Sequence, residues 1–239
     1  MKKLTLIPTL IIAVMTFGLI GCSDDEPGNG NGTMAISTEL ASGGTVKSQT
    51  FGGKSDPSGL FVDSLKVTYA AVVISNLKIH HAGSTDSTDD GTIKTGPFLL
   101  VFDSAGSHVA VSSPVPAGTY DRIKFEIHKL RNGVDDSLRT LLTDFVTNDA
   151  TFKFMGHVWV AGVQSDFTVY ADNTENIQEF FDPDNVEIVE NSTSNVTLQF
   201  DPAGVFVQSG VVGVIDPRDA TNKNVIKAGI HDAFKAMKK

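Results

Sequence analysis

The side chains able to bind a transition metal are mainly histidines and methionines, because the one cysteine cannot supply a set of thiolate ligands. Met155, His157 and Trp159 alternate along one extended segment, which places them on the same face of a strand. Copper accepts thioether and imidazole ligands, so Met155 and His157 form one candidate site. His80 and His128 form a second if their strands pair. Strand histidines that only make hydrogen bonds explain the same pattern.

Acidic loops suggest a different kind of metal site. Asp86, Asp89 and Asp90 lie in the loop sequence STDSTDDGT, and residues 182–185 form a similar cluster. Their oxygens suit calcium, but neither loop has the alternating ligands and the later glutamate of an EF-hand. Turns favour Asp and Asn for conformational reasons as well. A calcium loop and an ordinary turn both remain open.

The sequence gives little sign of catalysis. It contains no Gly-x-Ser-x-Gly nucleophile motif, no glycine-rich phosphate loop and no cysteine placed as a nucleophile. We therefore expect a protein that is not an enzyme and has no cofactor apart from the metal ion considered above. Sugar binding uses exposed aromatic rings. With one tryptophan, Trp159, and three tyrosines, Tyr69, Tyr120 and Tyr170, such rings are scarce.

The single cysteine, Cys22, follows an apolar segment that begins after Lys2 and Lys3. A basic start, an apolar middle and small residues before a cleavage point are typical of a secretory signal, and the segment is short for a membrane span. The sequence LIGC, residues 19–22, resembles the lipobox of bacterial lipoproteins. The resemblance implies that residues 1–21 are a signal peptide and that Cys22 is acylated. A plain signal peptide is the alternative.

Residues 22–33 have the composition of a flexible tether, because an acidic run and a glycine- and asparagine-rich run bury no apolar surface. Ser23 stands where an aspartate would resemble an inner-membrane retention signal, so we expect the outer membrane. The acidic residues 24–26 resemble the surface-export signal of Bacteroidota lipoproteins, but a solvated tether explains them equally well. The periplasmic or surface orientation is left open.

The net charge limits the choice of partners. The chain carries 19 basic and 28 acidic residues, and removal of the signal peptide lowers the net charge from −9 to −11. The basic residues are scattered along the sequence, whereas nucleic-acid binding requires them to cluster. We expect no nucleic-acid partner. The expected partners are the membrane, through the lipid anchor, and a glycan or a protein.

Period-2 alternation dominates residues 34–239, which we expect to form one domain. Leu65, Val67 and Tyr69 alternate with polar residues, and four further segments do the same: 77–81, 123–128, 152–160 and 196–200. Turn-forming residues separate these segments, so the sequence predicts an all-β fold, an antiparallel β-sandwich. Only the end of the sequence has helical spacing, which predicts an amphipathic C-terminal helix at about 220–238.

The segments VVISNLKIHHAG, FLLVFDSAG and VPAGTYDRIKFEI, between Val72 and Ile127, resemble an uncharacterised group of bacterial lipoprotein domains. That group has a prealbumin-like, carbohydrate-binding-like sandwich, so the resemblance implies a prealbumin-like or immunoglobulin-like fold. A looser similarity is to a copper-associated periplasmic family. We therefore expect a lipid-anchored envelope protein with a non-catalytic binding or scaffolding role toward a glycan or a protein. Copper binding through the strand histidines and Met155 is the alternative.

Overall fold

The computed structural model describes residues 30–47, 61–84, 91–130, 139–140, 142–207 and 213–238, and these residues form a mostly-β domain. The strands are β1 (Asn31–Leu40), β2 (Thr45–Lys47), β3 (Phe61–Val62), β4 (Ser64–His81), β5 (Thr92–Asp103), β6 (His108–Pro116), β7 (Gly118–Ile127), β8 (Phe152–Val160), β9 (Val163–Ala171), β10 (Glu175–Asp182), β11 (Val186–Ile188), β12 (Thr193–Phe200), β13 (Val214–Ile215) and β14 (Phe234–Lys238). The helices are short: η1 (Ala41–Gly44), α2 (Thr143–Thr147), α3 (Pro202–Phe206), η2 (Ala220–Asn222), α4 (Lys223–Gly229) and η3 (His231–Ala233).

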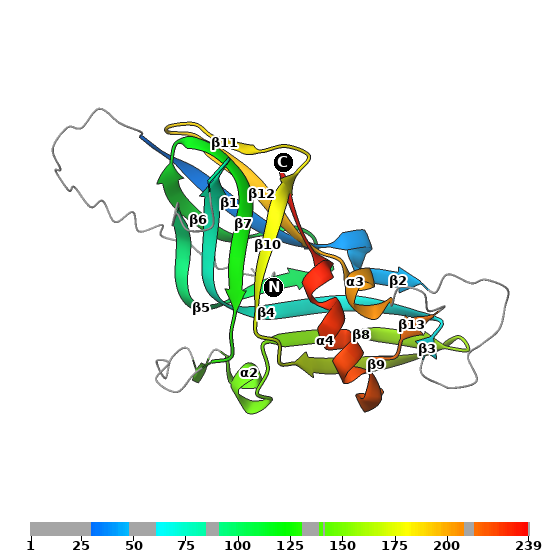
Figure 1. Ribbon diagram of the computed structural model, residues 1–239. Helices are drawn as coiled ribbons and strands as arrows, with labels where there is room; N and C mark the ends of the chain where they lie inside the picture. The colour runs from blue at the N-terminus through cyan, green and yellow to red at the C-terminus, as the bar shows by residue number, and fades with distance from the viewer. Residues whose placement is uncertain are drawn as a thin grey trace, which may run out of the picture.

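Twelve strands form one curled sheet in the order β6-β1-β12-β14-β10-β7-β4-β8-β9, with β2, β5 and β11 paired beside this path. Figure 1 shows how the sheet folds over itself to enclose a core. The predicted all-β, sandwich-like class is confirmed. The sheet is mixed rather than purely antiparallel, because β1 pairs in parallel with β12 and β10 pairs in parallel with β14. Alternation identifies a strand but carries no information about the direction of its neighbour.

Strand β4 connects the two parts of the curled sheet. It is 18 residues long, and its first half pairs with β2 and β8, whereas its second half pairs with β7. Strand β5 runs beside its middle. In Figure 1, β4 crosses the molecule from one part to the other. The two segments that alternate at 65–69 and 77–81 are therefore one strand.

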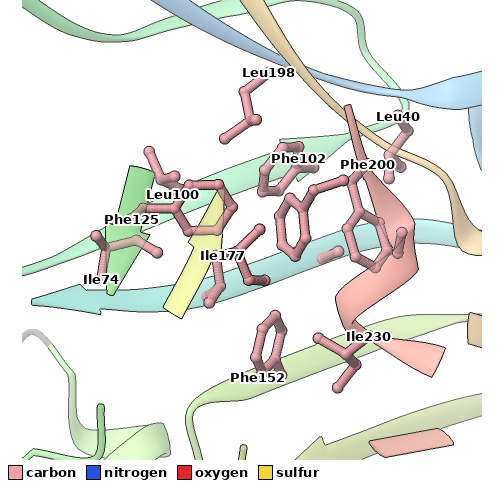
Figure 2. Close-up of a cluster of buried hydrophobic side chains, with 14 of the residues drawn as sticks. Leu40, Ile74, Leu100, Phe102, Phe125, Phe152, Ile177, Leu198, Phe200 and Ile230 are labelled. Carbon is pink, nitrogen blue, oxygen red and sulfur yellow. The ribbon is translucent and has the colours of Figure 1, made fainter. Parts of the chain in front are cut away.

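An aromatic cluster fills the space inside the curled sheet. Figure 2 shows Phe102, Phe125, Phe152 and Phe200 converging from four strands, together with aliphatic side chains. Phe234 lies among them and is 2% exposed, with its ring centroid 4.9 Å from that of Phe125 and 5.2 Å from that of Phe200. Each fully buried phenylalanine contributes roughly 1.5–3 kcal/mol of transfer free energy. This cluster is the centre of the core.

The predicted helix at 220–238 is correct only for its first part. Helical segments run from Ala220 to Ala233, but residues Phe234–Lys238 form β14, which lies between β12 and β10. The sequence FKAMK alternates as a strand does: Phe234 and Ala236 are buried and Lys235 is exposed. Both periodicities fit these residues, and the sheet decides between them because β12 and β10 supply the backbone partners.

The predicted tether, residues 22–33, ends earlier than expected. Residues 1–29, including Cys22 and the predicted signal peptide, lie outside the described residues. Strand β1 begins at Asn31 and pairs with β6 from its first residue. A Cβ on Gly32 would come within 2.5 Å of Ile188 and of the Val189 carbonyl. Gly32 therefore allows close packing. The composition of residues 22–33 had suggested a flexible linker at this position.

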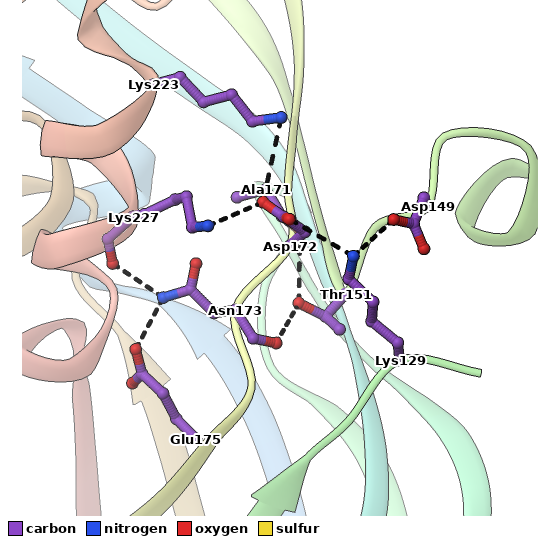
Figure 3. A network of polar contacts seen from close by, with 9 residues as sticks. All are labelled: Lys129, Asp149, Thr151, Ala171, Asp172, Asn173, Glu175, Lys223 and Lys227. Atoms are coloured by element: carbon purple, nitrogen blue, oxygen red, sulfur yellow. Dashed lines mark hydrogen bonds and ion pairs between the residues drawn. The ribbon is translucent and has the colours of Figure 1, made fainter. Parts of the chain in front are cut away.

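A polar network fixes the connection from β9 to β10 (Figure 3). The Asp172 carboxylate forms ion pairs with three lysines. Its oxygens lie 2.9 Å from Lys227 Nζ, 3.4 Å from Lys129 Nζ and 3.9 Å from Lys223 Nζ. Asn173 Nδ2 donates to the Lys227 carbonyl at 2.8 Å. These contacts join α4 to the end of β9. The neighbouring lysines, Lys227 first, lower the pKa of Asp172 from its ordinary 3.8 to about 2.

Replacement of Asp172 by asparagine is expected to lower the free energy of unfolding by about 1 kcal/mol at pH 7, because solvent screens an ion pair that is one-third exposed. The folded pKa lies below the unfolded one, so this stabilisation is present above about pH 4 and is lost as the pH falls towards 2. Urea unfolding of both proteins at pH 7 and at pH 2.5 measures the difference. An equal difference at both pH values would contradict the assignment.

Candidate binding face on β4, β8 and β9

Strand β8 presents a buried and an exposed side. Phe152, Phe154 and Val158 point into the core and are at most 1% exposed. The alternate residues Met155, His157 and Trp159 point outward, as their spacing predicts. Met155 is 37% exposed, and the His157 ring lies 6.1 Å from the Trp159 ring. The exposed side of β8 and of its neighbours is called the β8 face below.

Strand β4 adds Ser64, Lys66 and Tyr69 to the β8 face. Ser64 is the register partner of Trp159, Lys66 of His157 and Tyr69 of Met155. The register shifts between Val67 and Tyr69, a β-bulge that takes up Thr68. Without this extra residue Tyr69 would point into the core with Leu65 and Val67, as the alternation predicts. That prediction is wrong because the bulge turns Tyr69 outward beside Met155.

Strand β9 supplies the third side. It follows β8 through a tight turn in which Ala161 and Gly162 have φ values of 50° and 78°, suited to a two-residue hairpin. Asp166 pairs with His157, and Tyr170 with Lys153. The network around Asp172, two residues beyond Tyr170, holds the end of this strand. The hairpin therefore places Asp166 and Tyr170 along the β9 edge of the β8 face.

Helix α2 covers one end of the outward side, where Tyr69 and Tyr170 pack against its cluster, and no other described element covers the Trp159 end. Phe145 of α2 is 4% exposed and packs with Ala71 and Val73 of β4 in a small cluster separate from the main core. The rows beyond this cover extend from Met155 to Trp159, a length of roughly 13 Å at about 3.3 Å per residue. Three strands give the face a width of roughly 10 Å. Its shape is that of a short strip.

The polar groups of the β8 face are held in place by pairs. His157 Nδ1 lies 2.7 Å from Asp166 Oδ1. Lys153 Nζ contacts the Asp144 carboxylate, and the hydrogen bond from Lys153 to that carboxylate raises the lysine pKa. Burial raises the pKa of Tyr69 above its ordinary 10, so its hydroxyl stays protonated and able to donate at neutral pH. The strip therefore combines fixed hydrogen-bonding groups with aromatic surface.

The tryptophan and two of the three tyrosines lie on the β8 face, and the third tyrosine is buried elsewhere. Trp159, Tyr69 and Tyr170 all belong to the β8 face and are partly exposed. Tyr120 is fully buried, donates to the Pro116 carbonyl at 2.9 Å and stacks with His81. Sequence counting indicated that aromatic rings were scarce. It could not show that three of the four Trp and Tyr rings lie together.

The predicted metal ligands are not brought together as a set. Met155 and His157 do share the β8 face. His80 is buried opposite Arg122, whereas Ile127, the residue before His128, pairs with Ile74. Their strands pair, but this register leaves His80 and His128 roughly 20 Å apart along β4, so the predicted meeting is wrong.

Larger groups of metal-binding residues are also missing from the part of the chain that the structure describes. No three or more His, Cys, Asp and Glu side chains there are grouped so as to hold a metal ion. The candidate calcium ligands Asp86, Asp89 and Asp90 lie outside the described residues. The calcium loop stays a prediction.

The described ranges contain no helix of the length and apolarity needed to cross a membrane. No protein-family model, curated protein or solved structure matches this chain.

Proposed function

We propose that the protein is a non-catalytic, lipid-anchored envelope protein that binds a glycan on its β8 face. One observation carries the proposal: Trp159, Tyr69 and Tyr170 are partly exposed on one strip of sheet, between fixed polar groups. Anchoring through an acylated Cys22 at the outer membrane is the second part of the proposal and rests on the sequence of residues 19–22.

The chemistry of the strip suits a sugar chain. The C–H faces of pyranose rings pack on aromatic rings, and their hydroxyl groups bind polar side chains placed between such rings. On the β8 face, Trp159 lies at one end and Tyr69 and Tyr170 towards the other, with the His157–Asp166 pair between them. A strip roughly 13 Å long accommodates a short run of rings of an extended oligosaccharide.

The position of the strip is compatible with anchoring. In Figure 1 the start of β1, where the chain enters the domain, and the turn between β8 and β9 lie at opposite ends of the molecule. A lipid anchor on Cys22 would therefore attach to the domain at the end opposite the Trp159 end of the strip. This arrangement favours a ligand outside the bilayer.

Fluorescence titration tests glycan binding, because Trp159 is the only tryptophan. The expected result is a saturable change in Trp159 emission with at least one of a panel of hexasaccharides of glucose, xylose, mannose, galacturonic acid and mannuronic acid. Binding is confirmed by calorimetry. A panel with no saturable change and no measurable heat would contradict the proposal.

Copper binding is a second candidate, favoured by the position of Met155 and His157 at adjacent outward positions of β8. Only two of the predicted ligands meet there, so we expect weak binding. In a Cu²⁺ and Cu⁺ titration, quenching of Trp159 at stoichiometric metal that disappears in His157→Ala would support this candidate. Absence of stoichiometric quenching, or quenching that the variant retains, would exclude a site on the β8 face.

A further inference from the structure

Two lysines lie on the same outward side of the sheet as Trp159. Lys47 of β2 is the register partner of Ser64, which is itself the partner of Trp159, and Lys66 is the partner of His157. The intervening residues Val46 and Leu65 are buried, so both lysines point to the outward side. Neither forms an ion pair within 4.0 Å with any residue that the structure describes. Lys47 is exposed and Lys66 half-buried.

The described carboxylates of this side of the sheet have contacts with groups other than these lysines. Asp166 contacts His157 at 2.7 Å, and Asp63 Oδ2 accepts the Ala161 N–H at 2.7 Å. Asp144, at the other end of the strip, contacts Lys153. Within the described residues, Lys47 and Lys66 thus keep ammonium groups that contact no carboxylate, so both are able to pair with a ligand that lies over Trp159. The scattered basic residues of the sequence converge locally through the pairing of β2, β4 and β8.

We propose that the ligand of the β8 face is an acidic glycan, in which ring carboxylates bind Lys47 and Lys66 while a sugar ring packs on Trp159. The inference rests on the proposed glycan function and adds the charge class of the ligand. Lys47 and Trp159 lie two strand spacings apart, roughly 10 Å, so a carboxylate and a stacked ring on the same oligosaccharide reach both. Lys66, in the next row, contacts the same ligand from the side of His157.

Charge complementarity separates this class of ligand from neutral glycans. An acidic protein repels a polyanion in general, so a polyanion binds only where local positive charge exceeds that repulsion. Lys47 and Lys66 offer two ammonium groups for direct pairing with ligand carboxylates, and the aromatic ring on the same side recognises a sugar and not a simple anion. Binding should therefore require both the carboxylates and the rings of the ligand.

The test compares matched ligands. Hexagalacturonate and hexamannuronate are titrated against their carboxyl-reduced forms, which keep the rings and linkages and lose the charge. The double variant Lys47→Gln/Lys66→Gln removes both charges from the face. Lys124→Gln, on the outward side of β7, is the control with the same chemical change on another part of the sheet. Calorimetry at 50 mM and 500 mM NaCl gives the affinities.

We expect at least one uronate to bind the wild-type protein about fivefold more tightly than its reduced form at low salt, the gain of two exposed charge pairs. The preference should vanish in the double variant and at high salt, and persist in Lys124→Gln. Equal binding of acid and reduced forms, or a preference that the double variant retains, would overturn the inference while leaving glycan binding intact. Binding of inorganic phosphate with the same dependence on Lys47 and Lys66 would also overturn it. Failure of every neutral and acidic sugar would instead contradict the proposed function itself.

Discussion

Replacement of Phe234 by alanine is expected to lower the free energy of unfolding by about 4 kcal/mol. The side chain is 2% exposed, and its ring contacts those of Phe102, Phe125, Phe152 and Phe200. Removing it leaves a cavity where four other strands meet β14. Because small domains are stable by only about 5–15 kcal/mol, this single change consumes a large part of the total.

Urea unfolding followed by Trp159 fluorescence measures the loss. The matched control is Phe180→Ala on β10, where the same atoms are removed from a side chain that is 59% exposed. We expect that control to cost less than about 1 kcal/mol. Similar losses for the two variants would contradict the placement of β14 inside the sheet, which is the part of the fold that the sequence pattern did not predict.

Replacement of Trp159 by alanine is expected to weaken binding of the preferred oligosaccharide by at least about thirtyfold. Buried tryptophan contacts in binding sites typically contribute 2 kcal/mol or more, and a factor of ten corresponds to about 1.4 kcal/mol. Trp159 is the largest ring of the β8 face and lies on the same outward side as Lys47 and Lys66. Without it, the ligand keeps its polar contacts and loses the surface that recognises a sugar ring.

Calorimetry measures this change, since the variant has no tryptophan to report binding. Phe180→Ala again serves as the control, because Phe180 is an exposed aromatic residue outside the β8 face. That variant should bind as the wild type does. Loss of binding in Phe180→Ala with retention in Trp159→Ala would move the site to β10 and contradict the assignment to the β8 face.

Sequence periodicity predicted the strands well where both faces of a strand have a constant environment. Strand β8 shows this: Phe152, Phe154 and Val158 are buried, and Met155 and His157 are outward. Periodicity failed where a β-bulge reverses the alternation of inward and outward residues, and where a segment fits both helical and strand spacing. The bulge in β4 reverses Tyr69, and the residues of β14 follow helical spacing as well as strand alternation. In both cases the sheet neighbours, which are distant in sequence, decide.

Only part of the candidate site could be predicted from the sequence, again because residues distant in sequence form the rest of it. The outward trio on β8 lies within five residues, so its shared face follows from local geometry. Lys47, Lys66 and Tyr170 reach that face through three different strand pairings. The registers of these pairings depend on the whole core. A count of rings and charges along the sequence therefore underestimates their local density, and it overestimated the chance that His80 meets His128.

Nuclear magnetic resonance mapping of the ligand contact tests the central claim most directly. The tightest-binding oligosaccharide of the panel is titrated into the ¹⁵N-labelled protein, and the amide shifts are followed residue by residue. We predict that the largest changes occur at Trp159, His157 and Met155 and at Lys66 and Tyr69 beside them. Changes centred on the outward sides of β7 and β10, with the β8 face unaffected, would contradict the account.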